Sequence, residues 1–234
     1  MRAYSRAYGV NLDEAADCPD GYCSFDAFFT RRLREGARTV STDSVVSPAD
    51  GVLSSVGSVD PGMRLWVKGR PYDVGDLIGD PVSAERYRGG EFAVVYLAPG
   101  DYHRVHSPVA GSITQVRGIP GDLFPVNAIG ERHVPRLFVE NSRVAIQIDA
   151  PGLGQVQAVM VGAVIVGRMS VTGIDAADVP PGLHRFDPAI PVERGGEIGI
   201  FHLGSTVVLL IEPGVHIQRQ LGPIRYGESL VARS

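Results

Sequence analysis

The sequence predicts an α+β protein that is mainly antiparallel β, folded as a sandwich or a partly closed barrel, with amphipathic helices at its N-terminus. From about residue 45 onward, short apolar runs typical of strands are separated by turn-forming pairs such as Gly89-Gly90 and Pro151-Gly152. No strand alternates regularly with a long helical pattern, which disfavours a parallel doubly wound sheet. The predicted strands are 51–56, 64–68, 91–97, 111–116, 143–149, 155–169 and 197–211.

Composition excludes several classes of protein. The 234 residues, 44% hydrophobic and 21% charged, suit one large globular domain, and a net charge of −4 gives no attraction to nucleic acid. We find no signal peptide, no apolar run long enough to cross a bilayer and no nucleotide-binding glycine motif. Lys68 is the only lysine and stands in no recognisable site, so we do not expect pyridoxal phosphate. Cys18 and Cys23 are expected to be a reduced pair.

Residues 1–40 are predicted to be helical and rich in arginine. Ser24 is a suitable N-cap, and Phe25, Phe28, Phe29 and Leu33 follow it at helical spacing. We expect this helix to pack its phenylalanine face on the body of the protein. The alternative is that the segment binds an anionic membrane surface. Its arginines would then face the lipid: Arg2, Arg6, Arg31, Arg32, Arg34 and Arg38.

A glycine and a hydroxyl residue stand between two strand-like runs in Leu203-Gly204-Ser205-Thr206. Glycine can take strained conformations that aim its carbonyl at a neighbouring hydroxyl, so Ser205 can attack the Gly204 carbonyl. The amide then becomes an ester. Loss of the Ser205 Cα proton eliminates the ester to dehydroalanine, which hydrolysis converts to a pyruvoyl group. The alternative is a strand bulge at Gly204 with Ser205 capping a turn.

Such a serine needs a base, and two other stretches offer one. Asp50 stands at a turn just before a strand, and His103 and His106 follow the strand that ends at Leu97. A histidine can take the serine proton, and an aspartate bonded to its other ring nitrogen fixes the tautomer. Asp50, His106 and Ser205 would make such a triad. Taken alone, Asp50 is better explained as a turn residue, and His103 and His106 are each better explained as ordinary surface or core residues.

Six short motifs occur together along the chain. They are Phe28-Phe29-Thr30-Arg31, Ser47-Pro48-Ala49-Asp50-Gly51, Tyr102-His103-Arg104-Val105-His106 with Pro108 and Gly111, Leu137-Phe138-Val139-Glu140-Asn141 with Arg143, Val161-Gly162-Ala163 with Val166-Gly167, and Leu203-Gly204-Ser205-Thr206. This ordered set, over about residues 4–213, closely resembles the phosphatidylserine decarboxylase proenzymes.

The resemblance implies a self-cleaving precursor. Cleavage between Gly204 and Ser205 would leave a β chain of residues 1–204 and an α chain of 205–234, held together as a heterodimer and able to form a homodimer of these pairs. Asp50, His106 and Ser205 would act as the relay for cleavage. The pyruvoyl group from Ser205, with no metal, would form a Schiff base with phosphatidylserine and release CO2, giving phosphatidylethanolamine in phospholipid biosynthesis.

The resemblance also implies where substrate is met. We expect His103 to contact the substrate or to protonate the carbanion, and we expect a peripheral enzyme on the cytoplasmic side of the cell membrane. Residues 1–40 would face the membrane, and 41–234 would form the β-rich catalytic domain. The other histidines are assigned to structure or surface: His133, His184, His202 and His216.

Parts of the sequence are compatible with three other functions. The nearest is a decarboxylase acting on another serine phospholipid. A β-barrel metal hydrolase could use His103 and His106 with an acid, although two histidines at this spacing make a poor zinc signature. The strand followed by residues 106–111 suggests a lipoyl- or biotinyl-type carrier module. The lysine that such a carrier needs at its turn is missing there, because Lys68 lies outside any such motif. Neither of the last two accounts for the motif around Ser205.

Overall fold

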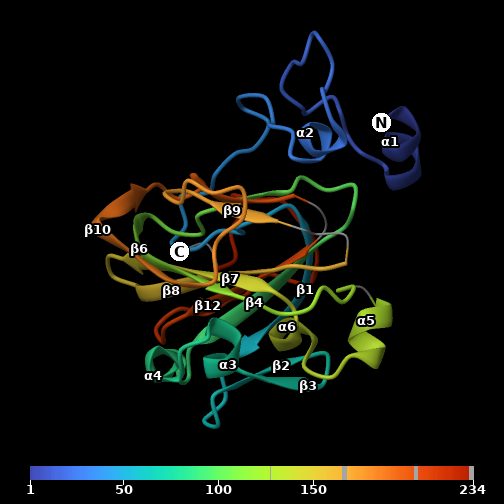
Figure 1. Cartoon of the computed structure of the whole chain (residues 1–234). Helices are drawn as coiled ribbons and strands as arrows, with labels where there is room; N and C mark the ends of the chain where they lie inside the picture. Colours follow the sequence, from blue (N-terminus) through green and yellow to red (C-terminus); the bar gives the residue numbers. More distant parts are fainter. Residues whose placement is uncertain (127, 165–167, 203–204, 232–234) are drawn as a thin grey trace.

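A computed structural model describes residues 1–126, 128–164, 168–202 and 205–231. Its centre is an open antiparallel sheet of eight strands, which confirms the predicted α+β, mainly antiparallel class (Figure 1). The strands lie in the order β10 (Gly182–Val192), β6 (Gly111–Ile119), β7 (Arg143–Ala150), β8 (Gly154–Val161), β12 (Ser205–Ile211), β4 (Glu91–Leu97), β1 (Gly51–Ser58) and β13 (Gly222–Ile224).

The central strand β12 is buried on both of its faces. Val207 and Leu209 belong to one hydrophobic core, Val208 and Leu210 belong to a second, and all four are fully buried. Successive residues of a strand point to opposite faces of the sheet, so a strand covered on both sides is apolar at every position. Each such side chain contributes about 1.5–3 kcal/mol by its burial. This explains the unbroken apolar run that follows Thr206.

The first core lies between the large sheet and a sheet of three strands. These are β5 (Arg104–His106), β11 (Glu197–Phe201) and β9 (Met169–Val171), with β11 in the middle. Val105, Ile198 and Met169 reach from this sheet into the first core. The two sheets therefore form a layered, sandwich-like arrangement, with β9 on one side of the large sheet in Figure 1.

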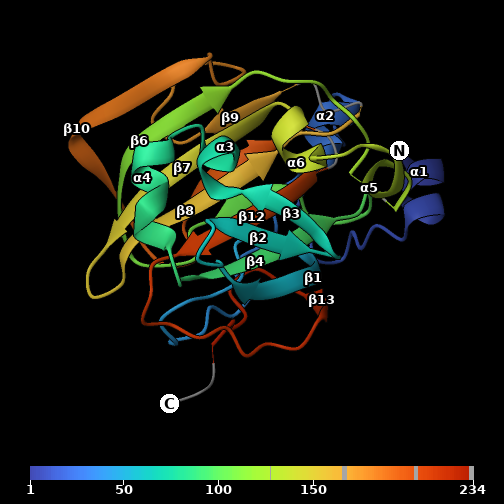
Figure 2. The ribbon, with the colours of Figure 1, turned by 90° about the horizontal axis from the view of Figure 1, so that it is seen from below.

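The second core is covered by a hairpin and short helices. The hairpin pairs β2 (Arg64–Val67) with β3 (Arg70–Asp73), and Figure 2 shows it lying over the large sheet beside two of the helices. The helical elements of this part of the chain are α3 (Val74–Ile78), α4 (Pro81–Ala84), η1 (Glu85–Tyr87), α5 (Ala128–His133) and α6 (Leu137–Glu140).

Two predicted strands are each divided in the structure. The run 155–169 contains β8, which ends at Val161, and the start of β9. The run 197–211 contains β11 and β12, which belong to different sheets. Strand β10 was not predicted, because Pro188 and Pro191 interrupt its pattern. Proline is tolerated on an edge strand, and β10 pairs only with β6 along the described chain.

The N-terminal segment is less helical than predicted. It holds α1 (Arg2–Tyr8) and α2 (Phe25–Phe29), which lie beyond the three-stranded sheet in Figure 1. The Ser24 cap is confirmed, since its side chain accepts a hydrogen bond from the Ala27 amide. Helix α2 stops before Leu33, which instead forms a β-bridge with Ala15. Within the described residues, no helix has the length and apolar character needed to span a membrane.

The packing expected for α2 is confirmed. Phe28 and Phe29 are each 1% exposed, whereas Phe25 at the start of the helix is 38% exposed. Their neighbour Arg31 donates from Nη2 to the carbonyls of Gly100 (3.2 Å) and Asp101 (3.3 Å). The segment is therefore fastened to the loop between β4 and β5.

Candidate active site

Ser205 is the first residue of β12, in the middle of the large sheet. Its backbone is paired with Leu97, the last residue of β4. The preceding strand β11 ends at Phe201 in the three-stranded sheet, so the chain crosses from one sheet to the other between Phe201 and Ser205. The predicted scissile bond falls in this crossover, but Leu203 and Gly204 lie outside the described residues.

The segment from the end of β4 to the start of β5 is bonded to the chain at both ends of this crossover. At one end Leu97 is paired with Ser205. At the other, the His103 carbonyl accepts a hydrogen bond from the Phe201 amide at 2.9 Å. The segment that carries the candidate histidines is therefore fixed beside the predicted cleavage site through backbone contacts.

His106 packs against two tyrosine rings. Its ring is parallel to that of Tyr226, with centroids 3.7 Å apart, and the Tyr102 centroid is 5.6 Å away. A backbone carbonyl can only accept, so Nδ1 carries the proton and donates it to the Gly195 carbonyl at 2.8 Å. Nε2 then accepts from the Tyr102 hydroxyl at 3.1 Å. Nε2 is therefore the ring nitrogen that can take up a proton.

The protonation state of His106 suits a base. Burial lowers the pKa of this imidazole, while the hydrogen bond to Gly195 and the nearby charges of Glu197 and Asp50 act in the opposite direction. A histidine with a pKa below its usual 6.5 is neutral at pH 7. It is then able to accept a proton, as general-base catalysis requires.

Asp50 is held by Arg38 and not by His106. The Arg38 guanidinium donates to the carboxylate from Nε at 3.2 Å and from Nη2, and the Tyr226 amide donates to Oδ1 at 2.9 Å. The direct hydrogen bond expected between Asp50 and His106 does not form here, because the Gly195 carbonyl accepts the proton of Nδ1. Asp50 acts on His106 through its charge, which raises the pKa of the ring.

His103 is fully buried and faces different neighbours. Its ring lies against Phe29, with centroids 4.0 Å apart, and its Nδ1 donates to the Asp101 carbonyl at 2.9 Å. Its Nε2 is buried without a hydrogen-bond partner among the described residues. Burial lowers the pKa of His103 to about 3, so the ring is neutral. An unpaired buried nitrogen costs about 1–3 kcal/mol, which makes it a candidate to meet a ligand.

The two histidines are not placed as a pair of metal ligands. The His103 ring contacts Phe29, and that of His106 contacts Tyr102 and Tyr226. The odd spacing in an extended segment predicts this separation onto opposite faces. Over the described ranges, no group of three His, Cys, Asp or Glu side chains could hold a metal ion.

The other histidines with described contacts bond to nearby groups. His184 Nε2 contacts the Pro180 carbonyl at 2.9 Å, and His216 lies 3.4 Å from Glu91. His202 contacts Asp26 and Ser170, and His133 ends α5.

Sequence reasoning missed three side chains of this site: Arg38, Tyr102 and Tyr226. Tyr102 stands within the quoted histidine motif, so its position was a usable signal. Arg38 was noted only as part of a basic N-terminal field, although it is 5% exposed and reaches into the body of the protein. Tyr226 follows 20 residues after Thr206, and only the fold brings it onto His106.

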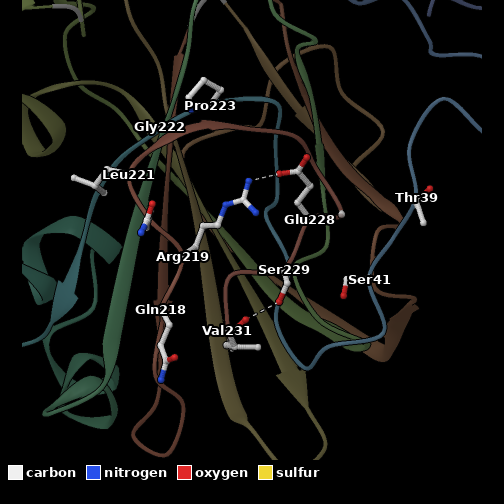
Figure 3. Close-up of a pocket in the computed structure, with 12 residues that line it drawn as sticks. Thr39, Ser41, Gln218, Arg219, Leu221, Gly222, Pro223, Glu228, Ser229 and Val231 are labelled. Carbon is white, nitrogen blue, oxygen red and sulfur yellow. Dashed lines mark hydrogen bonds and ion pairs between the residues drawn. The ribbon is translucent and has the colours of Figure 1, made fainter. Parts of the chain in front are cut away.

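Two cavities differ in their relation to these residues. One of about 280 Å³ is lined by Asp50, Arg38 and Tyr102. A larger one, of about 880 Å³, lies against the C-terminal segment, where Figure 3 shows the ion pair between Arg219 and Glu228. Asp50 and Tyr102 line the smaller cavity and not the larger one, so the smaller cavity is the one that adjoins the candidate site, although His103 and His106 line neither.

Comparison with known proteins gives consistent matches. The sequence model of the phosphatidylserine decarboxylase family matches residues 25–232. The phosphatidylserine decarboxylase proenzyme of Anaeromyxobacter sp. (strain K) is 41% identical over 242 residues, covering 98% of this chain and 85% of that protein. Those of Myxococcus xanthus (strain DK1622) and Marinobacter nauticus are 41% and 43% identical, over 91% and 88% of this chain and 78% and 75% of their own.

The similar proteins are named decarboxylase proenzymes and cover most of this chain, so the protein is of the class of decarboxylases that are made as precursors. The chain belongs to the phosphatidylserine decarboxylase family. This membership does not favour the metal hydrolase, the carrier or a decarboxylase of a different lipid.

Proposed function

We propose that this chain is a self-processing phosphatidylserine decarboxylase that cuts itself between Gly204 and Ser205. The observation that carries the proposal is the position of Ser205, which opens the central strand at the crossover between two sheets, in a chain 41% identical to a named proenzyme. The products would be a β chain of residues 1–204 and an α chain of 205–234, which remain together as a heterodimer.

In this proposal His106 is the base for cleavage. Its neutral Nε2 takes the Ser205 hydroxyl proton as that oxygen attacks the Gly204 carbonyl, and Tyr102 is the neighbouring hydroxyl that can pass a proton to or from that nitrogen. Asp50 stabilises the imidazolium through its charge, since its carboxylate is already bonded to Arg38. In this relay Asp50 therefore acts on His106 through its charge, and Tyr102 exchanges protons with His106, without a direct carboxylate–imidazole hydrogen bond.

The residues beside the crossover fit a pyruvoyl group at position 205. His103 presents a buried Nε2 that lacks a partner among the described residues, and its backbone is fixed opposite the end of β11. A pyruvoyl group supplies an electron-withdrawing carbonyl that draws electrons from the substrate as CO2 leaves. His103 would orient the substrate by accepting a hydrogen bond at its neutral Nε2, and it would supply the proton that replaces CO2 only after this nitrogen has itself taken up a proton.

We also propose that the enzyme meets its lipid at a membrane surface. Exposed apolar side chains occur at Leu12 and Phe25 in the N-terminal segment and at Leu123, Phe124 and Val164 in two loops. The two loops are held together by Asn141, whose amide bonds the main chain of Phe124 and the Gly162 carbonyl. Exposed apolar side chains suit peripheral contact with lipid, on the cytoplasmic side in this proposal.

The proposal is tested by the intact mass of the purified protein under denaturing conditions. We expect two chains that meet at Gly204 and Ser205, with the small chain lacking a free amino group, and CO2 release from vesicles that contain phosphatidylserine. A chain that stays whole in the presence of these vesicles would overturn the proposal. If CO2 is released only from a different serine phospholipid, the proposed substrate is wrong, but the proposed self-cleavage still stands.

The His103→Ala variant should separate cleavage from turnover. We expect it to be cut normally but to decarboxylate roughly 100-fold more slowly, because a positioned acid or base contributes 10²–10⁴-fold. Cleavage is read from the two chain masses and turnover from CO2 release, with His216→Ala, whose side chain is 81% exposed, as the matched control. Loss of cleavage in His103→Ala would contradict this division of roles.

A further inference from the structure

His202 is the last described residue before the predicted scissile bond, and its ring is held on both sides. Nδ1 lies 2.9 Å from Asp26 Oδ1, and Nε2 lies 3.2 Å from the Ser170 hydroxyl. Because a carboxylate only accepts, Nδ1 carries a proton and donates it to Asp26. The His202 amide also donates to the Arg168 carbonyl at 3.1 Å. The residue two places before Gly204 therefore has a defined position.

Asp26 comes from α2, far away in the sequence. Its Oδ1 contacts His202, and its Oδ2 lies 3.4 Å from Arg168 Nη2, so one carboxylate joins the helix to the end of β11 and to the residue before β9. The side chains of Asp26 and Arg168 are 40% and 46% exposed. An ion pair that exposed adds little to stability, so the contact between Asp26 and Arg168 contributes little to the fold.

Other contacts hold α2 in place without Asp26. Phe29 packs on the His103 ring, and Thr30 accepts a hydrogen bond through its carbonyl from Arg104 Nε at 2.9 Å. Arg31 adds its bonds to the loop after β4. The helix is thus docked by buried groups, and Asp26 reaches from that docked helix to the strand end that leads into the crossover.

We propose that Asp26 is a positioning residue for self-cleavage, which acts through His202 to place the chain that enters the Gly204–Ser205 bond. The inference rests on the proposed cleavage. The proposal gives helix α2 a role in processing. A shift of about 1 Å at a reacting group can cost 100-fold in rate, so a contact that fixes the chain before the scissile bond can control the rate of cleavage. In this proposal the contact between Asp26 and His202 couples the docking of α2 to the cutting of the chain.

The test follows cleavage of freshly synthesised chain over time by mass spectrometry. We expect Asp26→Ala to cleave roughly 10- to 100-fold more slowly. Asp26→Asn, whose amide oxygen still accepts from Nδ1, should restore a rate near that of the unchanged chain. His202→Asn keeps a donor near the position of Nδ1 and should be impaired less than His202→Ala. The matched control is Asp20→Ala, an exposed aspartate of the same segment.

Two further readouts distinguish positioning from a structural defect. The midpoint of thermal unfolding and the decarboxylation rate per cleaved chain should be unchanged in Asp26→Ala. Cleavage of Asp26→Ala at the normal rate, or slow cleavage in Asp26→Asn as well, would overturn the inference. An unchanged chain that never cleaves would instead overturn the proposed function on which the inference rests.

Discussion

Replacing Ser205 by alanine is expected to leave a single uncut chain of 234 residues without decarboxylase activity. The variant keeps the sequence around β12 but lacks the hydroxyl that would attack the Gly204 carbonyl. Intact mass would show one species of 25.0 kDa, and CO2 release from phosphatidylserine vesicles would be absent.

The control for this variant is Ser112→Ala, a serine in the strand β6 of the same sheet. It should be cut and be active as the unchanged chain is. A small fragment released from Ser205→Ala at the same position would mean that cleavage does not use this hydroxyl.

The second large effect is expected from Arg38→Met. Arg38 and Asp50 are 5% and 9% exposed, and Arg38 also bonds Glu14 at 2.8 Å. Removing one partner of a buried ion pair leaves an uncompensated charge and costs about 3–5 kcal/mol. We expect the midpoint of thermal unfolding to fall by roughly 10 °C, because each kcal/mol corresponds to about 2–4 °C in a chain of this size.

A double variant identifies the cause of that loss. Adding Asp50→Asn to Arg38→Met removes the unpaired charge, so it should regain part of the stability. Arg219→Met is the matched control, because its pair with Glu228 is 39% and 37% exposed and should matter little. Equal effects of Arg38→Met and Arg219→Met would show that the buried pair is not a significant source of stability.

Much of the fold was predictable because its strands are long and apolar. The run 91–97 coincides with β4, since a strand buried on both faces stands out from its flanking turns. Shorter elements were missed: β5 has three residues, and β13 contains Pro223. The break between β11 and β12 was also missed, because apolar character continues across it while the chain changes sheets.

For the candidate site, the sequence indicated the residues but not their contacts. Motifs singled out Asp50, His106 and Ser205 as candidates, but contacts between segments depend on packing that spacing does not encode. The Gly195 carbonyl is the partner of His106 Nδ1, and a carbonyl carries no signature in a sequence. The pairing of Arg38 with Asp50 could not be predicted, because it depends on the course of the N-terminal segment, and the helical pattern did not predict that course.

The position of the crossover has a consequence for the mature enzyme. If the chain is cut at the proposed bond, the small fragment would begin with β12, which is inserted between β4 and β8 and covered on both faces. Separating the two fragments would then expose both cores to water, so we expect them to stay together as one folding unit. Reassembly of the cut molecule after unfolding would be a bimolecular reaction that depends on concentration, whereas the precursor would refold as one tethered chain. The cut would thus make unfolding harder to reverse than it is in the precursor.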